Sequence, residues 1–453
     1  MSFPKYPEYK DSGVEWLGEV PAHWTVRRLR YTAAVNPPKS EVRTLPEDMA
    51  VTFLPMEALG EAGSLDLTEQ RALGEVIDGY TYLSEGDVAY AKITPCFENG
   101  KVALVRGALN RIAFGTTEVT VLRPLHQRTT SEYLLRVVSS EPFRVSGEAS
   151  MYGAGGQKRV PDDHARDFTI AWPPLIEQRQ ISYFLDHETA RIDALIEEQQ
   201  RLIELLKEKR QAVISHAVTK GLDPDVPMKD SGFEAIGAVP SHWEIQPLRS
   251  VMDRKRIIVG SRWDKFKLLS LTKSGVIERD VSENFGKFPG SFEAYQKVEV
   301  NDLVMCLFDI DETPRTVGLS KMEGMITGAY TVFTFRSLEV GDYLYFLFLH
   351  LDDVKGLRPY YSGLRKTIRS SSLLGMRMPI PPKEEARELS RYIKKTENRI
   401  DSLIAEAQEN ISLLQERRSA LISAAVTGKI DVRDWTPPDA SAEPEHEHEG
   451  AAT

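Results

Sequence analysis

Residues 173–219 read PPLIEQRQISYFLDHETARIDALIEEQQRLIELLKEKRQAVISHAVT, and residues 381–427 read PPKEEARELSRYIKKTENRIDSLIAEAQENISLLQERRSALISAAVT. The two stretches lie 208 positions apart and are identical at 23 of 47 positions. A shorter stretch is also repeated: residues 10–24 (KDSGVEWLGEVPAHW) return as residues 229–243 (KDSGFEAIGAVPSHW), with 10 of 15 positions identical. Repeats of this size mark copies of one structural unit, so the chain is predicted to be a duplication.

Each copy of the longer repeat has the pattern of one long helix. Each follows a Pro-Pro pair and ends near a glycine, Gly221 or Gly428, which are ordinary helix start and stop signals. Because each half carries one such helix, we expect the two to pack on each other, antiparallel if a pseudo-twofold relates the halves. An ordinary amphipathic helix on its own domain is the alternative. The apolar residues with coiled-coil spacing are Ile181, Leu185, Ile192, Leu195, Leu202, Leu206 and Val213, and then Leu389, Ile393, Ile400, Leu403, Leu414 and Leu421.

Two inserts, residues 25–172 and 244–380, lie between the repeated stretches and show only scattered similarity. Both read as mixed α/β. The predicted fold class is therefore α+β, with two mixed α/β domains joined by two long antiparallel coiled-coil helices in a pseudo-twofold internal duplication. A repeated frame around divergent inserts suits the presentation of two different binding surfaces. The expected strands are 80–92, 101–106, 118–122, 298–308 and 329–335, and the expected helices are 133–138 and 343–351.

The composition is typical of a soluble globular chain, with 41% hydrophobic and 27% charged residues among 453. No apolar run approaches the roughly 20 residues that span a bilayer, and no secretory signal opens the chain, so a cytoplasmic location is expected. Cys96 and Cys306 suit two reduced thiols better than a disulfide. The formal net charge is −10. Residues 431–453 hold seven acids and one arginine, a net of −6, and are predicted to be an acidic disordered tail.

Two glycine-containing loops at matching positions are candidates for DNA contact. Residues 153–159 (GAGGQKR) and residues 362–369 (SGLRKTIR) again lie 208 positions apart. Neither has the strand, helix and Gly-Lys-Ser/Thr context of a nucleotide-binding loop. Their polar and basic side chains are of the kinds that bond base edges and phosphates, and a solvated loop is the alternative. The candidate DNA-binding residues are Gln157, Lys158, Arg159, Arg365, Lys366, Thr367 and Arg369.

A third candidate segment, residues 92–101 (KITPCFENGK), joins two expected strands. It combines polar donors, an aromatic residue and turn residues, so DNA contact and an ordinary turn both remain open. The candidate DNA-binding residues here are Lys92, Thr94, Asn99 and Lys101.

The search for catalytic or metal-binding sets gives no convincing site. Asn36-Pro37-Pro38-Lys39 approaches the Asn-Pro-Pro-aromatic motif of adenine methyltransferases, but Lys39 replaces the aromatic and a turn is the simpler interpretation. Asp162-Asp163 has no nuclease-type Asp/Glu-x-Lys after it before Gly221. Glu445–Glu449 could bind a metal only weakly. We expect no catalytic residue, no metal site and no cofactor in this chain.

The repeated residues closely resemble the specificity subunit of type I restriction-modification enzymes, from about residue 3 to residue 432. The resemblance is carried by Asp11-Ser12-Gly13 through Pro21-Ala22-His23-Trp24, by the helix entry Pro173 to Ile181, and by Arg191-Ile192-Asp193. The second copy departs from the family pattern, because Ala386 and Leu389 stand where Gln178 and Ile181 stand in the first. This departure puts in doubt an equal affinity of the two helices for partner proteins.

The resemblance implies a non-catalytic subunit in which each of two target recognition domains reads one half of a bipartite site in double-stranded DNA. It implies two modification (methyltransferase) subunits docked on the helices, and restriction (motor and nuclease) subunits joined through that complex. S-adenosylmethionine, ATP and Mg would then belong to the partners. The alternatives are a self-contained adenine DNA methyltransferase and a coiled-coil adaptor without a DNA role. The implied domains are 1–172 (first recognition domain), 173–221 (central helix), 222–380 (second recognition domain), 381–430 (C-terminal helix) and 431–453 (tail).

Overall fold

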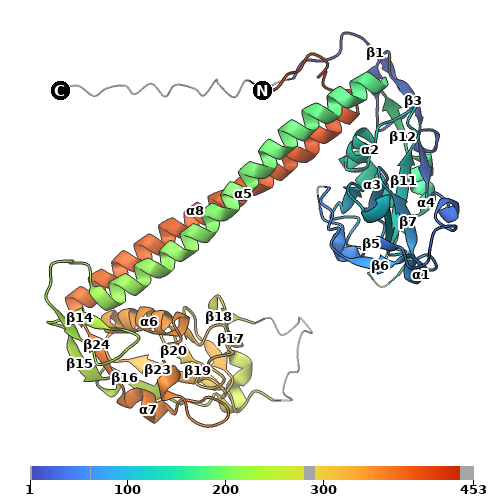
Figure 1. Cartoon of the computed structure of the whole chain (residues 1–453). Helices are drawn as coiled ribbons and strands as arrows, with labels where there is room; N and C mark the ends of the chain where they lie inside the picture. The colour runs from blue at the N-terminus through green and yellow to red at the C-terminus, as the bar shows by residue number, and fades with distance from the viewer. Residues whose placement is uncertain (1–2, 62, 155, 280–290, 439–453) are drawn as a thin grey trace, which may run out of the picture. The chain divides into compact units, whose positions relative to one another are not determined.

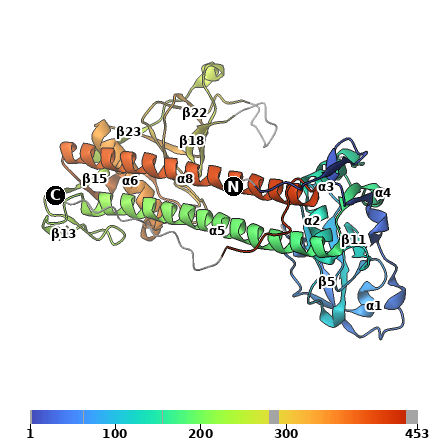
Figure 2. The same cartoon turned by 90° about the horizontal axis from the view of Figure 1, so that it is seen from above.

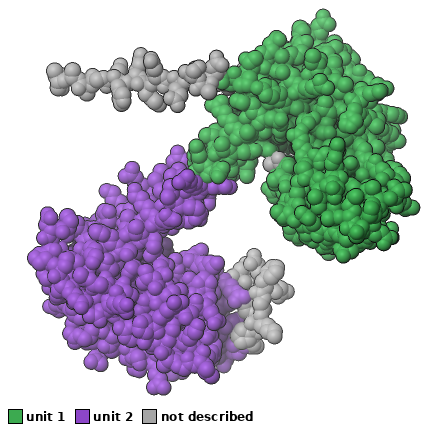
Figure 3. Space-filling model, viewed as in Figure 1, with its two compact units in different colours: residues 1–199, 409–453 green, residues 200–408 purple. Residues whose placement is uncertain are grey.

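The structure, a computed structural model, describes residues 3–61, 63–154, 156–279 and 291–438. The chain forms two compact units (Figure 3): unit 1 comprises Met1–Gln199 and Glu409–Thr453, and unit 2 comprises Gln200–Gln408. Two long helices, α5 (Leu175–Lys220) and α8 (Lys383–Val426), each contribute to both units (Figure 2). The chain thus has the mixed helix and sheet content and the two long helices predicted from its repeats.

Unit 1 carries two antiparallel pairs near the helices and two four-stranded sheets in its insert (Figure 1). One sheet, in the order β4-β11-β8-β9, is antiparallel throughout. The other, in the order β6-β5-β10-β7, has one parallel pair, β5 with β10. The strands are β1 (Tyr9–Asp11), β2 (Glu19–Pro21), β3 (Thr25–Arg28), β4 (Ala33–Val35), β5 (Ala50–Leu54), β6 (Gln70–Ala72), β7 (Thr81–Ser84), β8 (Val88–Ala91), β9 (Val102–Leu104), β10 (Ile112–Gly115), β11 (Val119–Pro124) and β12 (Thr169–Trp172). The short helices are α1 (Leu73–Val76), α2 (Ser131–Val138), α3 (Glu141–Ser150) and α4 (Asp162–Asp167).

Unit 2 has counterparts of one four-stranded sheet and of one antiparallel strand pair of unit 1. The sheet β16-β23-β20-β21 corresponds in order and direction to β4-β11-β8-β9, and β15 pairs with β24 as β3 pairs with β12. The strands are β13 (Met228–Asp230), β14 (Ala238–Pro240), β15 (Glu244–Pro247), β16 (Met252–Lys255), β17 (Leu269–Thr272), β18 (Gly275–Glu278), β19 (Gln296–Val298), β20 (Leu303–Met305), β21 (Val317–Leu319), β22 (Gly324–Ile326), β23 (Thr331–Phe335) and β24 (Arg377–Ile380). The helices are α6 (Leu338–Asp353) and α7 (Ser370–Gly375).

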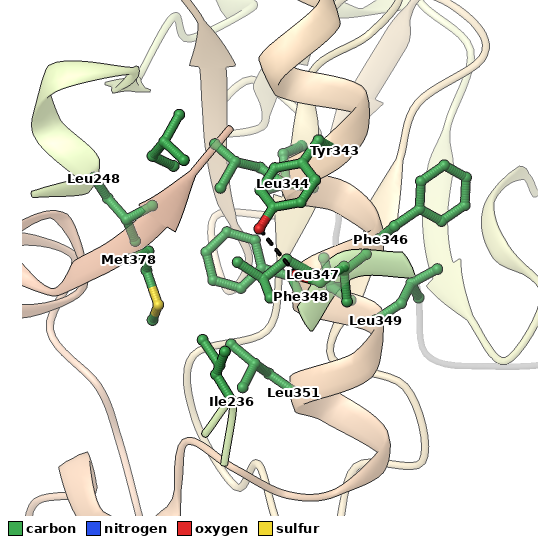
Figure 4. Close-up of a cluster of buried hydrophobic side chains, with 14 of the residues drawn as sticks. Ile236, Leu248, Tyr343, Leu344, Phe346, Leu347, Phe348, Leu349, Leu351 and Met378 are labelled. Atoms are coloured by element: carbon green, nitrogen blue, oxygen red, sulfur yellow. Dashed lines mark hydrogen bonds between the residues drawn. The ribbon is translucent and has the colours of Figure 1, made fainter. Parts of the chain in front are cut away.

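Each unit's core is closed by the beginning of one long helix and the end of the other. In unit 1, Ile181 and Phe184 of α5 share a buried cluster with Ile422 and Val426 of α8. In unit 2 the roles are exchanged, and Figure 4 shows the part of that cluster formed by α6, in which Tyr343 is fully buried. Burial of these apolar side chains is the main stabilising contribution to each unit.

The buried seam of the long helices lies one residue away from the predicted one near the middle of α5. Leu195 and Leu202, two predicted seam residues, are both 41% exposed, whereas Ile203, the residue after Leu202, is 7% exposed; Leu206, also a predicted seam residue, is buried as expected. An α-helix with 3.6 residues per turn drifts against a strict 3.5-residue repeat, so a seam assigned from heptads can slip onto the neighbouring position. In α8, Leu403 is likewise 39% exposed.

The prediction of a disordered tail that starts at residue 431 is wrong for residues 431–435. Val432 is 1% exposed, and Gln180 Nε2 donates to the carbonyl oxygens of Val432 and Trp435 at 3.1 and 2.7 Å. The Trp435 ring lies 5.1 Å from that of Phe184. Residues 431–435 therefore pack on unit 1 despite their charge, because they carry two large apolar side chains. Residues 439–453, including the Glu445–Glu449 stretch, lie outside the described residues.

Candidate nucleic-acid interface

The structure brings two candidate DNA-contact segments of unit 1 together. Arg159 forms β-bridges with both Tyr152 and Ile93. The Thr94 amide donates to the Lys158 carbonyl at 3.0 Å, and the Val160 amide donates to the Lys92 carbonyl at 2.8 Å. Segments 92–101 and 153–159, which the sequence analysis selected separately, thus share one backbone ladder at the edge of the unit.

Side chains on this ladder differ in whether they are free to contact a ligand. Gln157 and Lys158 are exposed, and within the described ranges their side chains have no hydrogen-bond or ion-pair partner. Arg159, in contrast, donates through Nε and an Nη to both carboxylate oxygens of Glu118, at 2.8 and 2.7 Å. The Arg159 guanidinium, with a smaller contribution from Lys92, holds the pKa of the Glu118 carboxyl below its ordinary value. Such a bidentate pair fixes the loop, so Arg159 positions Gln157 and Lys158.

The remaining candidates in segment 92–101 face other neighbours. Thr94 Oγ1 donates to Glu98 at 2.8 Å, and Lys101 Nζ donates to the Met56 carbonyl at 3.3 Å. Asn99 lines a cavity of about 520 Å³ together with Asp193 of α5 and Arg418 of α8. Asn99 and Lys101 therefore lie towards the long helices and the second sheet, apart from Gln157 and Lys158.

In unit 2, the candidate loop forms a closed turn. Ser362 and Thr367 exchange backbone hydrogen bonds of 2.9 and 3.0 Å. Arg365 donates to Asp309 at 3.0 Å, and the Lys366 ammonium lies 3.1 Å from a carboxylate oxygen of Asp311. The backbone of Arg369, an exposed residue, precedes α7 directly.

This loop lies against segment 306–316, which the sequence analysis missed. The Asp309 amide donates to the Arg365 carbonyl at 2.9 Å, and the Ile368 amide donates to the Leu307 carbonyl at 2.9 Å. The segment follows β20 as segment 92–101 follows β8, and it packs on the matching loop. Matching the two strands in the sequence would have identified it, but the inserts are too divergent for that match to be visible.

Asn36 has a structural role, as the simpler interpretation of its motif predicted. Its side-chain amide donates to Asp162 at 2.8 Å, and its side-chain oxygen accepts the Val121 amide at 2.9 Å. Its φ of 50° places it in the left-handed region, where asparagine is tolerated in turns. Asn36 therefore joins β4, β11 and α4.

The repeated His-Trp pair anchors each insert to the first turn of a long helix. In unit 1 the Glu177 carboxylate accepts from Trp24 Nε1 at 2.9 Å and pairs with His23 Nε2 at 2.7 Å. In unit 2 Glu385 makes the same contacts with Trp243 and His242, at the same two distances. The repeat thus encodes one joint between strand and helix, used twice.

Tyr6 adds a contact that only the first joint has. Its hydroxyl donates to Glu177 at 2.5 Å. Burial, together with the adjacent carboxylate, raises the pKa of Tyr6 far above its ordinary value, so the hydroxyl stays protonated and donates.

The second copy's departure from the repeat falls on buried positions. Gln178 is fully buried and uses its whole amide: it donates to the Arg128 and Pro173 carbonyls and accepts from Thr129 and Thr130. Ala386 and Leu389, the unit 2 counterparts of Gln178 and Ile181, are also fully buried. The substitution therefore changes packing inside unit 2 and leaves the exposed helix face unchanged.

Two equivalent ion pairs link α5 and α8. Arg418 Nε donates to Asp193 at 2.9 Å in unit 1, and Arg210 pairs with Asp401 in unit 2. A shift of 208 positions converts 193 into 401 and 210 into 418, so each pair is the other's counterpart. Each unit therefore contains the same antiparallel contact between the two helices, as the repeat predicted.

The exposed helix faces carry a duplicated pair of leucines. Leu195 and Leu403 are 41% and 39% exposed, and Leu205 and Leu413 are 52% and 55% exposed. The same shift of 208 positions relates the members of each pair. Exposed large apolar side chains in two matching sets are typical of docking surfaces for two equivalent partners.

Other sites are not found in the part of the chain that is described. Among these residues no group of three or more His, Cys, Asp and Glu side chains is placed to hold a metal ion. Both cysteines are free thiols, as expected. Within the described helices, none combines the length and the apolar character that a membrane crossing requires.

These features define a class of protein: an internally duplicated chain of two units, each of which combines a loop-bearing insert with parts of two antiparallel long helices. No protein-family model matches the chain. Over 165 residues it is 36% and 39% identical to the specificity subunits of the Escherichia coli type I restriction enzymes EcoEI and EcoAI. That match covers 36% of this chain but only 27% of either relative.

A longer match and two solved structures extend the similarity over most of the chain. The putative type I restriction enzyme MjaX specificity subunit of Methanocaldococcus jannaschii is 23% identical over 443 residues, covering 96% of this chain and 99% of that protein. The HsdS subunit from Thermoanaerobacter tengcongensis matches with a TM-score of 0.53 at 16% identity, and a chain from a type I R-M system matches with 0.64 at 15%. Both structural matches cover 90% of this chain and 98% of the other. The resemblance to specificity subunits is thus confirmed in sequence, and the chain has the HsdS fold.

Proposed function

We propose that this chain is the DNA sequence-specificity subunit of a type I restriction-modification complex, with each unit reading one half of a bipartite site in double-stranded DNA. The observation that carries the proposal is the His-Trp-Glu joint and the helix-helix ion pair repeated in both units, together with loops that differ. A frame kept twice around two different polar loops suits the reading of two different half-sites at a fixed spacing. The chain has no catalytic role in this proposal.

The exposed leucines support the docking of two modification subunits on the helices. Because Leu195 and Leu413 in unit 1 match Leu403 and Leu205 in unit 2 in position and exposure, each unit carries an equivalent candidate docking surface. Restriction subunits would join through the modification subunits. The partners would bring S-adenosylmethionine for methyl transfer, and ATP and Mg for the motor and nuclease.

Gln157 and Lys158 are the residues we expect to contact DNA in unit 1. Amide and ammonium groups bond base edges and phosphates, and these two are exposed and unpaired. Arg365 and Lys366 present cations in unit 2, with side chains 72% and 46% exposed despite their acidic partners. Lys92, Thr94, Asn99, Lys101, Arg159, Thr367 and Arg369 remain proposals for a supporting role around these loops.

The test is to co-express the chain with the modification subunits and to map methylated adenines on genomic DNA. We expect one bipartite motif that disappears when this chain is omitted. A motif that persists without the chain would contradict the proposal. A motif produced by this chain alone would instead support the methyltransferase alternative.

A variant series separates DNA reading from assembly. Gln157→Ala with Lys158→Ala is expected to leave the assembled complex intact and to reduce methylation of the native motif. Leu195→Ser with Leu413→Ser, both in unit 1, is expected to release one modification subunit of two, seen as a loss of mass by native mass spectrometry. Unchanged methylation in the first variant with normal assembly would favour an adaptor without a DNA role.

A further inference from the structure

Leu364 is exposed beyond the other large apolar residues of the described chain. Its relative exposure is 104%, whereas the remaining exposed ones run from 39% for Leu403 to 80% for Ile176. Single surface leucines are common, but they normally keep part of their side chain against neighbours. Leu364 stands free of the protein surface, at the tip of the unit 2 loop.

Backbone hydrogen bonds and ion pairs fix the conformation of the loop that carries Leu364. The Ser362 and Thr367 backbones close it, and the Lys366 amide donates to the Gly363 carbonyl at 3.1 Å. Gly363 and Lys366 both have positive φ, 71° and 45°, which makes the tight reversal. The next two side chains, Arg365 and Lys366, are tied to Asp309 and Asp311. The turn is thus preorganised, with its apolar side chain outward.

The surroundings of Leu364 suit a nucleic acid better than a protein groove. Arg365, 72% exposed, and Lys366, 46% exposed, follow it directly, and Arg369 adds a third exposed cation. An apolar side chain next to cations matches a base step bounded by phosphates. Proteins that bend DNA insert such apolar wedges between base pairs and partly unstack them.

We propose that Leu364 is a wedge residue that inserts between adjacent base pairs of the half-site read by unit 2. This inference rests on the proposed DNA-reading function. Insertion would bury a side chain that is now fully in water, and the neighbouring cations would lie near the flanking phosphates. The distortion would make the unit 2 half-site sensitive to how easily its sequence unstacks.

The corresponding loop of unit 1 has no large apolar side chain. Its residues 153–159 read GAGGQKR, and the Tyr152–Arg159 bridge that closes it spans two residues more than the Ser362–Thr367 bridge of unit 2. The wedge therefore belongs to one half of the molecule, and DNA distortion is expected at one half-site only. The half-site read by unit 1, where no distortion is expected, therefore serves as the control within the same complex.

The experiment uses the full chain assembled with its modification subunits and duplexes that carry the mapped motif. 2-Aminopurine is placed at successive positions of both half-sites, and its fluorescence reports unstacking. Leu364→Ala is compared with Leu364→Met, which keeps a long apolar side chain. Because the residue is fully exposed, both variants are expected to fold, which thermal unfolding checks.

With the native chain and with Leu364→Met, we expect increased fluorescence at one step of the unit 2 half-site. With Leu364→Ala we expect no increase and roughly tenfold weaker binding, as for the loss of one buried leucine. Native fluorescence and affinity in Leu364→Ala would overturn the wedge. Weaker assembly with unchanged DNA affinity would show a protein contact and would also overturn it. If no duplex motif can be mapped even with the native chain, the proposed function itself has failed.

Discussion

Glu177 and Glu385 bind the repeated His-Trp pair in their respective units, but the two carboxylates differ in burial. The Glu177 side chain is 3% exposed and accepts from Tyr6 as well as pairing with His23 and Trp24, whereas Glu385 is 27% exposed and has the two repeated partners. A buried donor left without an acceptor costs its full desolvation free energy. The two carboxylates are therefore a matched pair for testing what the joint contributes.

We predict that Glu177→Ala lowers the free energy of unfolding by about 3 kcal/mol and Glu385→Ala by about 1–2 kcal/mol. The reason is that Glu177→Ala leaves the buried Trp24 indole and Tyr6 hydroxyl unpaired. Urea unfolding of the full chain, followed by tryptophan fluorescence, measures both. Equal losses in the two variants would contradict the role assigned to Tyr6 and to burial.

His164 gives unit 1 a predictable response to acid. Its ring packs 4.8 Å from that of Phe143, and burial lowers its pKa from 6.5 to about 4. Between these pH values the unfolded chain binds a proton that the folded chain does not. The stability that depends on neutral His164 is thus complete above about pH 6.5 and is lost as the pH falls towards 4.

Between pH 7 and pH 5, we expect this titration to remove roughly 1–2 kcal/mol of stability. His164→Gln should show a smaller loss over the same interval, because glutamine does not titrate. Urea midpoints of both proteins at the two pH values measure the difference. An identical pH dependence in the variant would exclude His164 as the cause.

At this scale the sequence identified residue types but not their partners. Gln157, Lys158 and Arg159 are adjacent in the sequence. Among the described residues, only the Arg159 side chain of these three has a partner, the carboxylate of Glu118, which directly precedes β11. That contact depends on how a divergent insert folds, which no local pattern records. Asn36 was interpreted correctly because a turn needs only local residues.

The long helices were the most predictable elements. Pro-Pro starts and glycine ends placed them within a few residues of Leu175–Lys220 and Lys383–Val426, and Gly221 and Gly428 have positive φ of 76° and 72° just beyond them. The seam was less predictable, because Leu195 and Ile196 both fit an apolar pattern and only packing decides between them. The strands of the inserts were located, but their pairing was not, since it joins distant segments.

The antiparallel register of the helices gives a prediction at the scale of elements. Asp193→Arg and Arg418→Asp should each destabilise the chain, and the double variant should regain about 0.5–1 kcal/mol relative to the sum of the single losses. Arg418 is 16% and Asp193 48% exposed, so solvent screens the pair partly. The equivalent cycle at Asp401 and Arg210 should give a similar coupling, and zero coupling in both would contradict the register.

Over the full chain, the internal repeat is the feature that supports the proposed function. A shift of 208 positions relates the glutamates of the joints, the ion pairs and the exposed leucines, and a shift of 219 relates the His-Trp pairs of the joints, while the loops on the inserts differ. The duplication was visible in the sequence because the same packing contacts recur in both halves. The loop conformations were not visible, because the two inserts share little sequence and each loop is fixed by contacts with distant segments of its own insert.

A chimera with two copies of one insert separates the proposed recognition domains from the repeated frame that carries them. Residues 25–172 would occupy both positions, replacing residues 244–380, in a complex with the modification subunits. Because the proposed frame is a pseudo-twofold duplication, we predict that methylation mapping finds an inverted repeat of the half-site read by unit 1. If an assembled chimera still methylates the original asymmetric motif, the inserts do not read the half-sites, and if it methylates a direct repeat, the frame is not twofold.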